Sequence, residues 1–166
     1  MYAALAGNKT RNDLIFEDLL TCIKAGRSPI LLTERTSQVD EFATRMATLV
    51  KHVVVLKGGM RVKQRRAVAA QLKAIPDGEE RVLLATGRYI GEGFDDARLD
   101  TLFLAVPISW SGTLQEYGGR LHRLHDSKRE VIAYDYVDAA APVLFKMYSK
   151  RVRGYQAVGY VIRVPL

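Results

Sequence analysis

Short, continuously apolar runs alternate along this chain with longer segments of helical periodicity, and this alternation constrains the fold more than any other feature. Strands buried on both faces of a sheet have such continuous runs, and the runs lie at 30–33, 52–57, 81–86, 101–106 and 130–136. Apolar residues that recur every three or four positions indicate amphipathic helices, here over 12–25, 37–49, 63–74, 113–124 and 142–153. Strands that alternate with helices predict an α/β domain with a mostly parallel sheet covered by helices on both faces.

The length and composition suit a single domain with an anionic partner. We place the domain at 1–154 of the 166 residues, with 1–11 as a possible linker and 155–166 as a tail or an extra strand. The net charge of +7 favours phosphate-rich ligands. The single cysteine excludes an intrachain disulfide and fits a reducing cytoplasm. No apolar run reaches the roughly 18 residues of a membrane helix, so we expect a cytoplasmic protein with no membrane partner.

A glycine-rich segment follows the third predicted strand, at 85–95. Its three glycines allow the backbone to turn sharply and approach a ligand closely. Thr86 stands at the end of the strand, where its hydroxyl could bind a phosphate, and Asp95 could accept hydrogen bonds from ribose hydroxyls. From the spacing alone, a glycine-rich loop with no ligand is an equally open interpretation.

Two arginines on one predicted helix form the second chemical feature. Arg120 and Arg123 are three positions apart and therefore share a helix face. Two guanidinium groups on one face suit a polyphosphate, because each offers a planar fork of donors and stays charged. The residues alone leave open that these arginines cover a helix surface, or pair with Asp126 and Glu130.

The order of four segments resembles the C-terminal, second RecA-like domain of superfamily 2 DEAD/DEAH-type helicases, over about residues 12–138. The segment 30–35 resembles motif IV, 56–66 resembles the glycine loop and basic helix that follow it, 84–95 resembles motif V, and 115–123 resembles motif VI. The stretch from Ala85 to Asp95 is most similar to the restriction-enzyme and DNA-repair branch of these helicases.

The resemblance implies a RecA-like fold of the P-loop NTPase type and a role for each matching residue. Arg123 would be the arginine finger, with Arg120 beside it. The residues on the nucleotide side would be Gly91, Gly93, Asp95, Gln115 and Glu116. The residues along the nucleic-acid track would be Thr33, Glu34, Arg35, Gly58, Gly59, Thr86 and Gly87. Because Glu116 stands where the family has Gln or His, the coupling role stays open between Glu116 and Gln115.

The sequence lacks the Walker A pattern G-x-x-x-x-G-K-[ST] and an acidic Walker B box after a strand. The groups that cradle the phosphates and hold Mg²⁺ are therefore missing. We expect that the chain alone does not hydrolyse ATP, and that ATP and Mg²⁺ act with a separate N-terminal RecA-like domain. We expect no metal site in this chain, and DNA rather than RNA as the nucleic acid. The alternatives are a nucleotide-sugar-type transferase on a doubly wound fold and a degenerate helicase-fold interaction module.

Overall fold

The computed structural model describes residues 7–86, 96–106, 121, 130–138 and 140–164. Within these residues the helices are α2 (Lys9–Lys24), α3 (Thr36–Met46), α4 (Val62–Ala74) and α6 (Pro142–Ala157). The strands are β1 (Pro29–Thr33), β2 (His52–Leu56), β3 (Arg81–Thr86), β4 (Thr101–Leu104) and β5 (Ile132–Asp135). Every predicted strand is present, and so is each predicted helix except 113–124, which lies outside the described residues apart from the helical Leu121.

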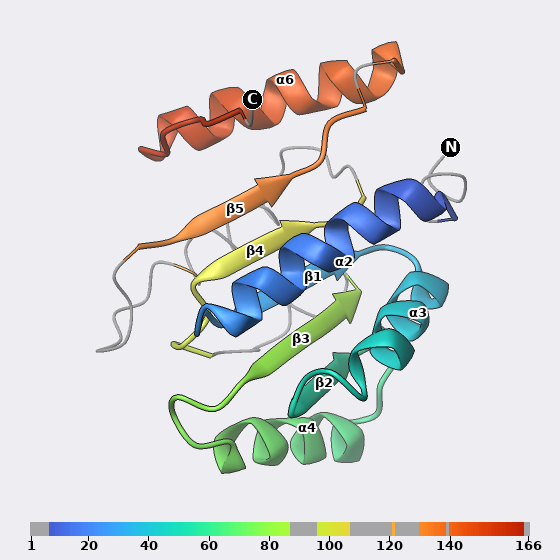
Figure 1. The fold of residues 1–166 in the computed structure, drawn as a ribbon, viewed down its shortest axis with the longest axis vertical. Coiled ribbons are helices and arrows are strands. Elements are labelled where there is room, and N and C mark those ends of the chain that lie inside the picture. The colour runs from blue at the N-terminus through green and yellow to red at the C-terminus, as the bar shows by residue number, and fades with distance from the viewer. Residues whose placement is uncertain (1–6, 87–95, 107–120, 122–129, 139, 165–166) are drawn as a thin grey trace.

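The five strands form one sheet in the order β2-β3-β1-β4-β5, and every neighbouring pair is parallel. Figure 1 shows β1 at the centre, with β2 and β5 at the two edges. The predicted parallel sheet is therefore confirmed. In such a sheet the carboxyl ends of all strands meet at one edge, which is where α/β proteins bind their ligands.

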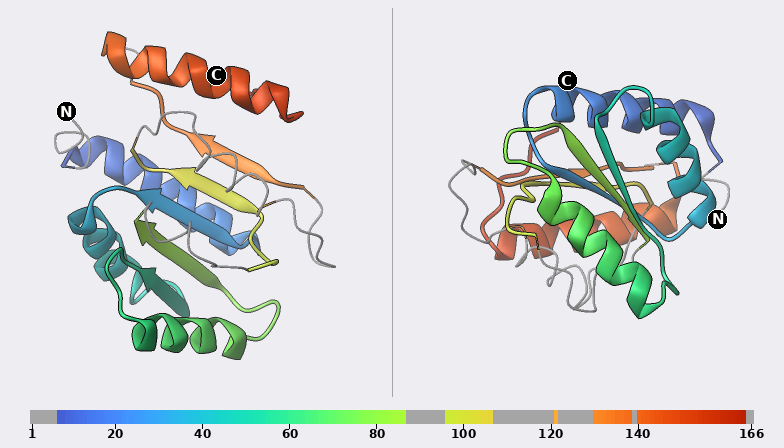
Figure 2. Two further views of the ribbon diagram at one scale, coloured as in Figure 1. Left: turned by 180° about the vertical axis from the view of Figure 1, so that it is seen from behind. Right: turned by 90° about the horizontal axis from the view of Figure 1, so that it is seen from below.

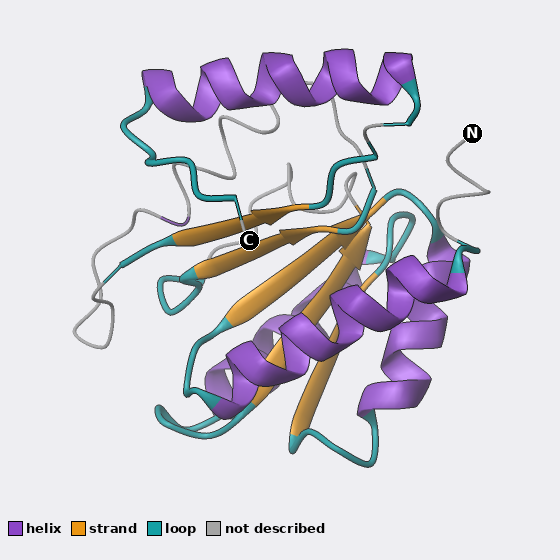
Figure 3. Ribbon diagram, turned by 45° about the horizontal axis from the view of Figure 1, so that its top comes forward, coloured by secondary structure: helices purple, strands orange, loops and turns teal. Residues whose placement is uncertain are grey.

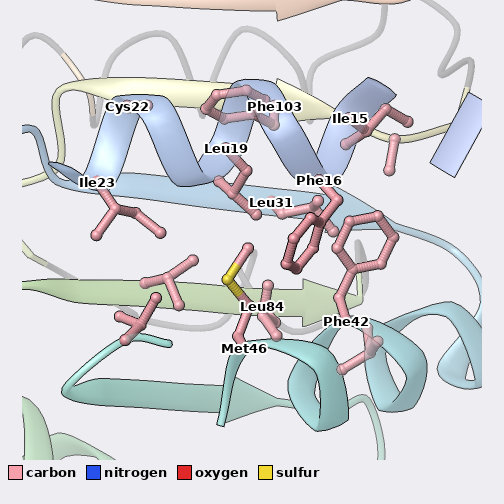
Figure 4. Packing of buried hydrophobic residues seen from close by; sticks show 14 residues of the cluster. Ile15, Phe16, Leu19, Cys22, Ile23, Leu31, Phe42, Met46, Leu84 and Phe103 are labelled. Atoms are coloured by element: carbon pink, nitrogen blue, oxygen red, sulfur yellow. The ribbon is translucent and has the colours of Figure 1, made fainter. Parts of the chain in front are cut away.

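Helices cover both faces of the sheet, as predicted. The helices α2 and α3 lie on one face and α4 and α6 on the other (Figures 2 and 3). Alternation along each strand separates the two cores. Leu31 packs with Phe16 and Phe42 below α2 and α3 (Figure 4), whereas Ile30 and Leu32 pack on the side of α4 and α6.

The last helix differs from its prediction at one end. Gly154 was expected to follow the end of the helix, but α6 continues to Ala157 and buries Gly154. Residues 158–164 are neither helix nor strand. Tyr160 and Ile162 of this segment pack against the core, and the ring of Tyr160 meets Tyr155 edge-on with centroids 5.9 Å apart.

A buried ion pair joins α6 to the carboxyl end of β5. Arg151 is the buried cation of this helix, with an exposed fraction of 1%. Its Nε and Nη2 atoms donate to Oδ2 and Oδ1 of Asp135 at 2.7 and 2.8 Å. The hydroxyl of Tyr155 donates to the same carboxylate at 3.0 Å. In the described part of the chain, no helix is long and apolar enough to cross a membrane.

Candidate nucleic-acid interface

The carboxyl edge of the sheet brings together residues from three separate sequence segments. Thr33, at the end of β1, lies beside Thr86, at the end of β3. The loop after β2 reaches the same place, because the backbone N–H of Gly58 donates to Oγ1 of Thr86 at 2.7 Å. Thr33, Gly58 and Thr86, which the sequence assigns to one track, therefore share one edge of the fold.

The side chain of Thr33 lies below the surface of this edge. It is fully buried, donates to Oε1 of Gln38 at 2.6 Å and accepts from the backbone N–H of Arg35 at 3.1 Å. Glu34 and Arg35 are exposed. Any part that Thr33 takes in ligand binding is therefore indirect, through the conformation of the loop that carries Glu34 and Arg35.

A buried relay of amides connects this loop to α2. Nε2 of Gln38 donates to Oδ1 of Asn12 at 3.0 Å, and Nδ2 of Asn12 donates to Oε2 of Glu41 at 3.3 Å. Gln38 and Asn12 are each only 1% exposed. Sequence reasoning missed both residues, although one signal was present: Gln38 lies four positions before Phe42 and therefore on the buried face of α3.

The loop between β2 and α4 depends on one glycine. Gly59 has a φ of +82°, a left-handed conformation that a side chain disfavours, although a Cβ there would have open space around it. Gly58 and Gly59 are both exposed. Nζ of Lys57 lies 2.5 Å from Oδ1 of Asp40, which ties this loop to α3.

Two helix N-termini and two exposed arginines lie at this edge. The helices α3 and α4 both begin here, and neither has an acidic residue in its first turn. Helix N-termini present free N–H groups and the positive end of the helix dipole, so they attract phosphate oxygens. Arg35 and Arg61, which immediately precede the two helices, add exposed cations.

Arg11 holds the start of α2 against the carboxyl end of β4. Its Nη1 donates to the backbone oxygen of Ala105, and its guanidinium lies 6.0 Å from the ring centroid of Tyr136. Burial lowers the pKa of Arg11, and burial with a hydrogen bond to Asp18 raises the pKa of Tyr136. The segment 1–11 was expected to be a linker, but Lys9–Arg11 form the first turn of α2, which Asn8 caps by accepting from the N–H of Arg11 at 3.0 Å.

The other predicted site residues lie outside the described residues. They are Gly87, Gly91, Gly93, Asp95, Gln115, Glu116, Arg120 and Arg123. Their roles in nucleotide and nucleic-acid binding stay predictions. Among the described residues, no three His, Cys, Asp or Glu side chains gather closely enough to hold a metal ion, and the binding of Mg²⁺ by another domain also stays a prediction.

No protein-family model matches the chain. Uncharacterized protein 108L of Invertebrate iridescent virus 3 is 36% identical to it over 83 residues, which are 50% of this chain and 75% of that protein. The chain belongs to the same family as protein 108L.

Solved structures of helicase-type domains share the fold. T4 UvsW has a TM-score of 0.71 at 17% identity and matches 94% of this chain. The C-terminal part of the Fun30 ATPase domain has a TM-score of 0.65 at 16% identity and matches 82%. The E. coli DEAD-box protein SrmB, solved bound to RraA, has a TM-score of 0.59 at 23% identity and matches 82%. The chain spans 34% of UvsW, 43% of the Fun30 fragment and 77% of SrmB. These likenesses confirm the predicted RecA-like α/β fold.

Proposed function

We propose that the chain is the second motor domain of an ATP-dependent helicase or translocase of superfamily 2, of the restriction and repair type, and that its substrate is DNA. Two findings support the proposal. The fold is that of helicase-type domains such as those of UvsW and SrmB. Thr33, in the segment that resembles motif IV, and Thr86, in the segment that resembles motif V, lie side by side at the carboxyl edge of the sheet.

The observation that carries the proposal is the hydrogen bond from Gly58 to Thr86. It holds an exposed glycine loop against the end of β3, at the same edge of the sheet as the exposed Arg35. Backbone N–H groups, helix N-termini and arginines are the groups that position a phosphodiester backbone without reading its sequence. A strand of nucleic acid along this edge would meet all three kinds of group.

ATP would bind between this domain and one that carries the Walker sequences. Hydrolysis of its terminal phosphate bond would let the two domains separate. Mg²⁺ would be held by that other domain. In this chain, Arg123 with Arg120 beside it would sense the γ-phosphate, and the edge around Gly58 would hold the strand. Repeated closure and opening would then step the protein along the strand, because ATP binds the two arrangements with different affinity.

The test is a matched pair of substitutions at Thr86. Thr86→Val removes the acceptor of the Gly58 N–H, and Thr86→Ser keeps it. We expect the wild-type chain to bind a fluorescent oligonucleotide, measured by anisotropy, with a dissociation constant on the order of 10⁻⁶–10⁻⁴ M. The hydrogen bond contributes about 1 kcal/mol to holding the loop in place, so Thr86→Val should weaken binding by up to roughly fivefold, and Thr86→Ser should restore it.

Competition with unlabelled RNA of the same sequence tests the preference for DNA. Equal affinity of the wild type and Thr86→Val for DNA would remove the support that this hydrogen bond gives. Tight binding of a nucleotide sugar without affinity for DNA would favour the transferase alternative instead.

A further inference from the structure

The helix α4 exposes most of its surface. Its one buried residue is Leu72, and Val68 is partly buried against the same core. The helix packs on β2, which is an edge strand of the sheet. Because so few side chains of α4 pack against the core, a long face of this helix has no partner among the described residues.

This exposed face carries an unbalanced positive charge. The stretch from Arg61 to Ala74 contains five arginines and lysines and no acidic residue, against a net charge of +7 for the whole chain. Some exposed cations elsewhere form ion pairs, as Lys24 does with Glu80 at 2.9 Å and Lys51 does with Glu79 at 2.6 Å. No ion pair joins Lys63, Arg66 or Lys73 to any acidic residue that the structure describes.

The spacing of these cations places them in one stripe. Lys63, Arg66, Ala70 and Lys73 are separated by three, four and three positions, so they share a face, and this face lies opposite Leu72. The stripe is about 15 Å long at 1.5 Å per residue. About four phosphates of one DNA strand occupy that length of a duplex. The exposed, small Ala70 allows a backbone to approach closely.

The stripe is continuous with the carboxyl edge, because α4 begins three residues after Gly59, in the loop held by Thr86. Figure 1 shows α4 along the β2 side of the sheet, at the opposite end of the molecule from α6. We infer that the Lys63–Arg66–Lys73 stripe is a second phosphate-binding surface, which holds the nucleic-acid backbone where it extends beyond the edge. This inference rests on the proposed function and adds the direction in which the nucleic acid continues.

The test compares two triple variants that remove the same charge. Lys63→Gln, Arg66→Gln and Lys73→Gln together empty the stripe. Lys146→Gln, Lys150→Gln and Arg153→Gln together are the control, because these cations are equally exposed on α6. The affinity for an oligonucleotide duplex is measured by anisotropy between about 25 and 200 mM salt, together with the urea midpoint of each variant.

We expect the α4 variant to reduce the magnitude of the slope of log K against log salt by about 2 to 3, since each neutralised phosphate contributes about 0.9. The control should leave the slope within about 0.5. An equal reduction in both variants overturns the inference, because only net charge then matters. Equal binding of polyglutamate and DNA, lost together in the α4 variant, overturns it in favour of an acidic protein partner.

Failure of the inference can be told apart from failure of the proposed function. A slope that is unchanged in the α4 variant, while Thr86→Val still weakens binding, overturns the stripe and leaves the carboxyl edge in place. Absence of any duplex or single-strand binding by the wild-type chain overturns both.

Discussion

Removal of the Arg151 guanidinium should strongly destabilise the domain. Arg151 is 1% exposed and makes two hydrogen bonds to Asp135. In Arg151→Met, the Asp135 carboxylate, whose side chain is 10% exposed, would keep only the Tyr155 hydroxyl of the partners described above. A buried charge that loses its partner costs about 3–5 kcal/mol, which is a large part of the roughly 5–15 kcal/mol that stabilises a typical domain.

The assay is urea unfolding followed by far-ultraviolet circular dichroism. With a slope of about 2 kcal/mol per M, the midpoint should fall by about 1.5–2.5 M. The exposed Lys150→Met on the same helix is the matched control and should change stability by less than about 0.5 kcal/mol. Because the two side chains act as a pair, Asp135→Asn combined with Arg151→Met should lose less than the sum of the single losses. A loss below about 1 kcal/mol in Arg151→Met, or simple addition of the single losses, would refute this reasoning.

Three further predictions concern the described site and core. Gln38→Leu removes the acceptor of the buried Thr33 hydroxyl and the donor to Oδ1 of Asn12, so the free energy of unfolding should fall by about 1–3 kcal/mol; an unchanged thermal midpoint would contradict the relay. Gly59→Ala should cost about 1–2 kcal/mol because φ is +82°, whereas Gly58→Ala, without a positive φ, should cost clearly less in the same urea assay. Burial raises the pKa of the Cys22 thiol from 9.0 to about 11, so the stabilisation is present below about pH 9 and is lost as the pH rises toward 11. The urea midpoint of unfolding should fall over that pH range more in the wild type than in Cys22→Ala. Rapid reaction of Cys22 with a thiol reagent in the native state at pH 8 would show that the thiol is not buried.

The sheet and its helices could be predicted because their signal is local. A strand buried on both faces is apolar along most of its length, and 30–32 and 82–85 are continuous apolar runs. The helices α2 and α3 show their buried faces by the spacing of apolar residues such as Leu19 and Phe42. The motif order then indicated which loops would lie at the carboxyl edge.

The partners of the buried polar groups could not be predicted, because they belong to different helices and strands. In the sequence, Arg151 cannot be distinguished from the exposed cations near it. Its burial depends on the ion pair with Asp135, which lies at the end of β5. Gln38 and Asn12 belong to different helices and are satisfied only when both pack beneath Thr33 and Glu41. A polar residue is expected to be exposed unless its hydrogen-bond or ion-pair partner is known, and that partner is apparent only in the tertiary structure.

Arginine 123 tests the central claim that this chain is the ATP-sensing half of a motor. The measurement is nucleic-acid-stimulated ATP hydrolysis by a protein in which this chain is joined to a Walker-type domain, as we propose, compared with its Arg123→Ala variant. We predict that stimulated hydrolysis falls by about 10³-fold or more, the effect that an arginine finger has in GTPases, while the affinity for DNA is unchanged. Hydrolysis at the wild-type rate in the Arg123→Ala variant would contradict the claim.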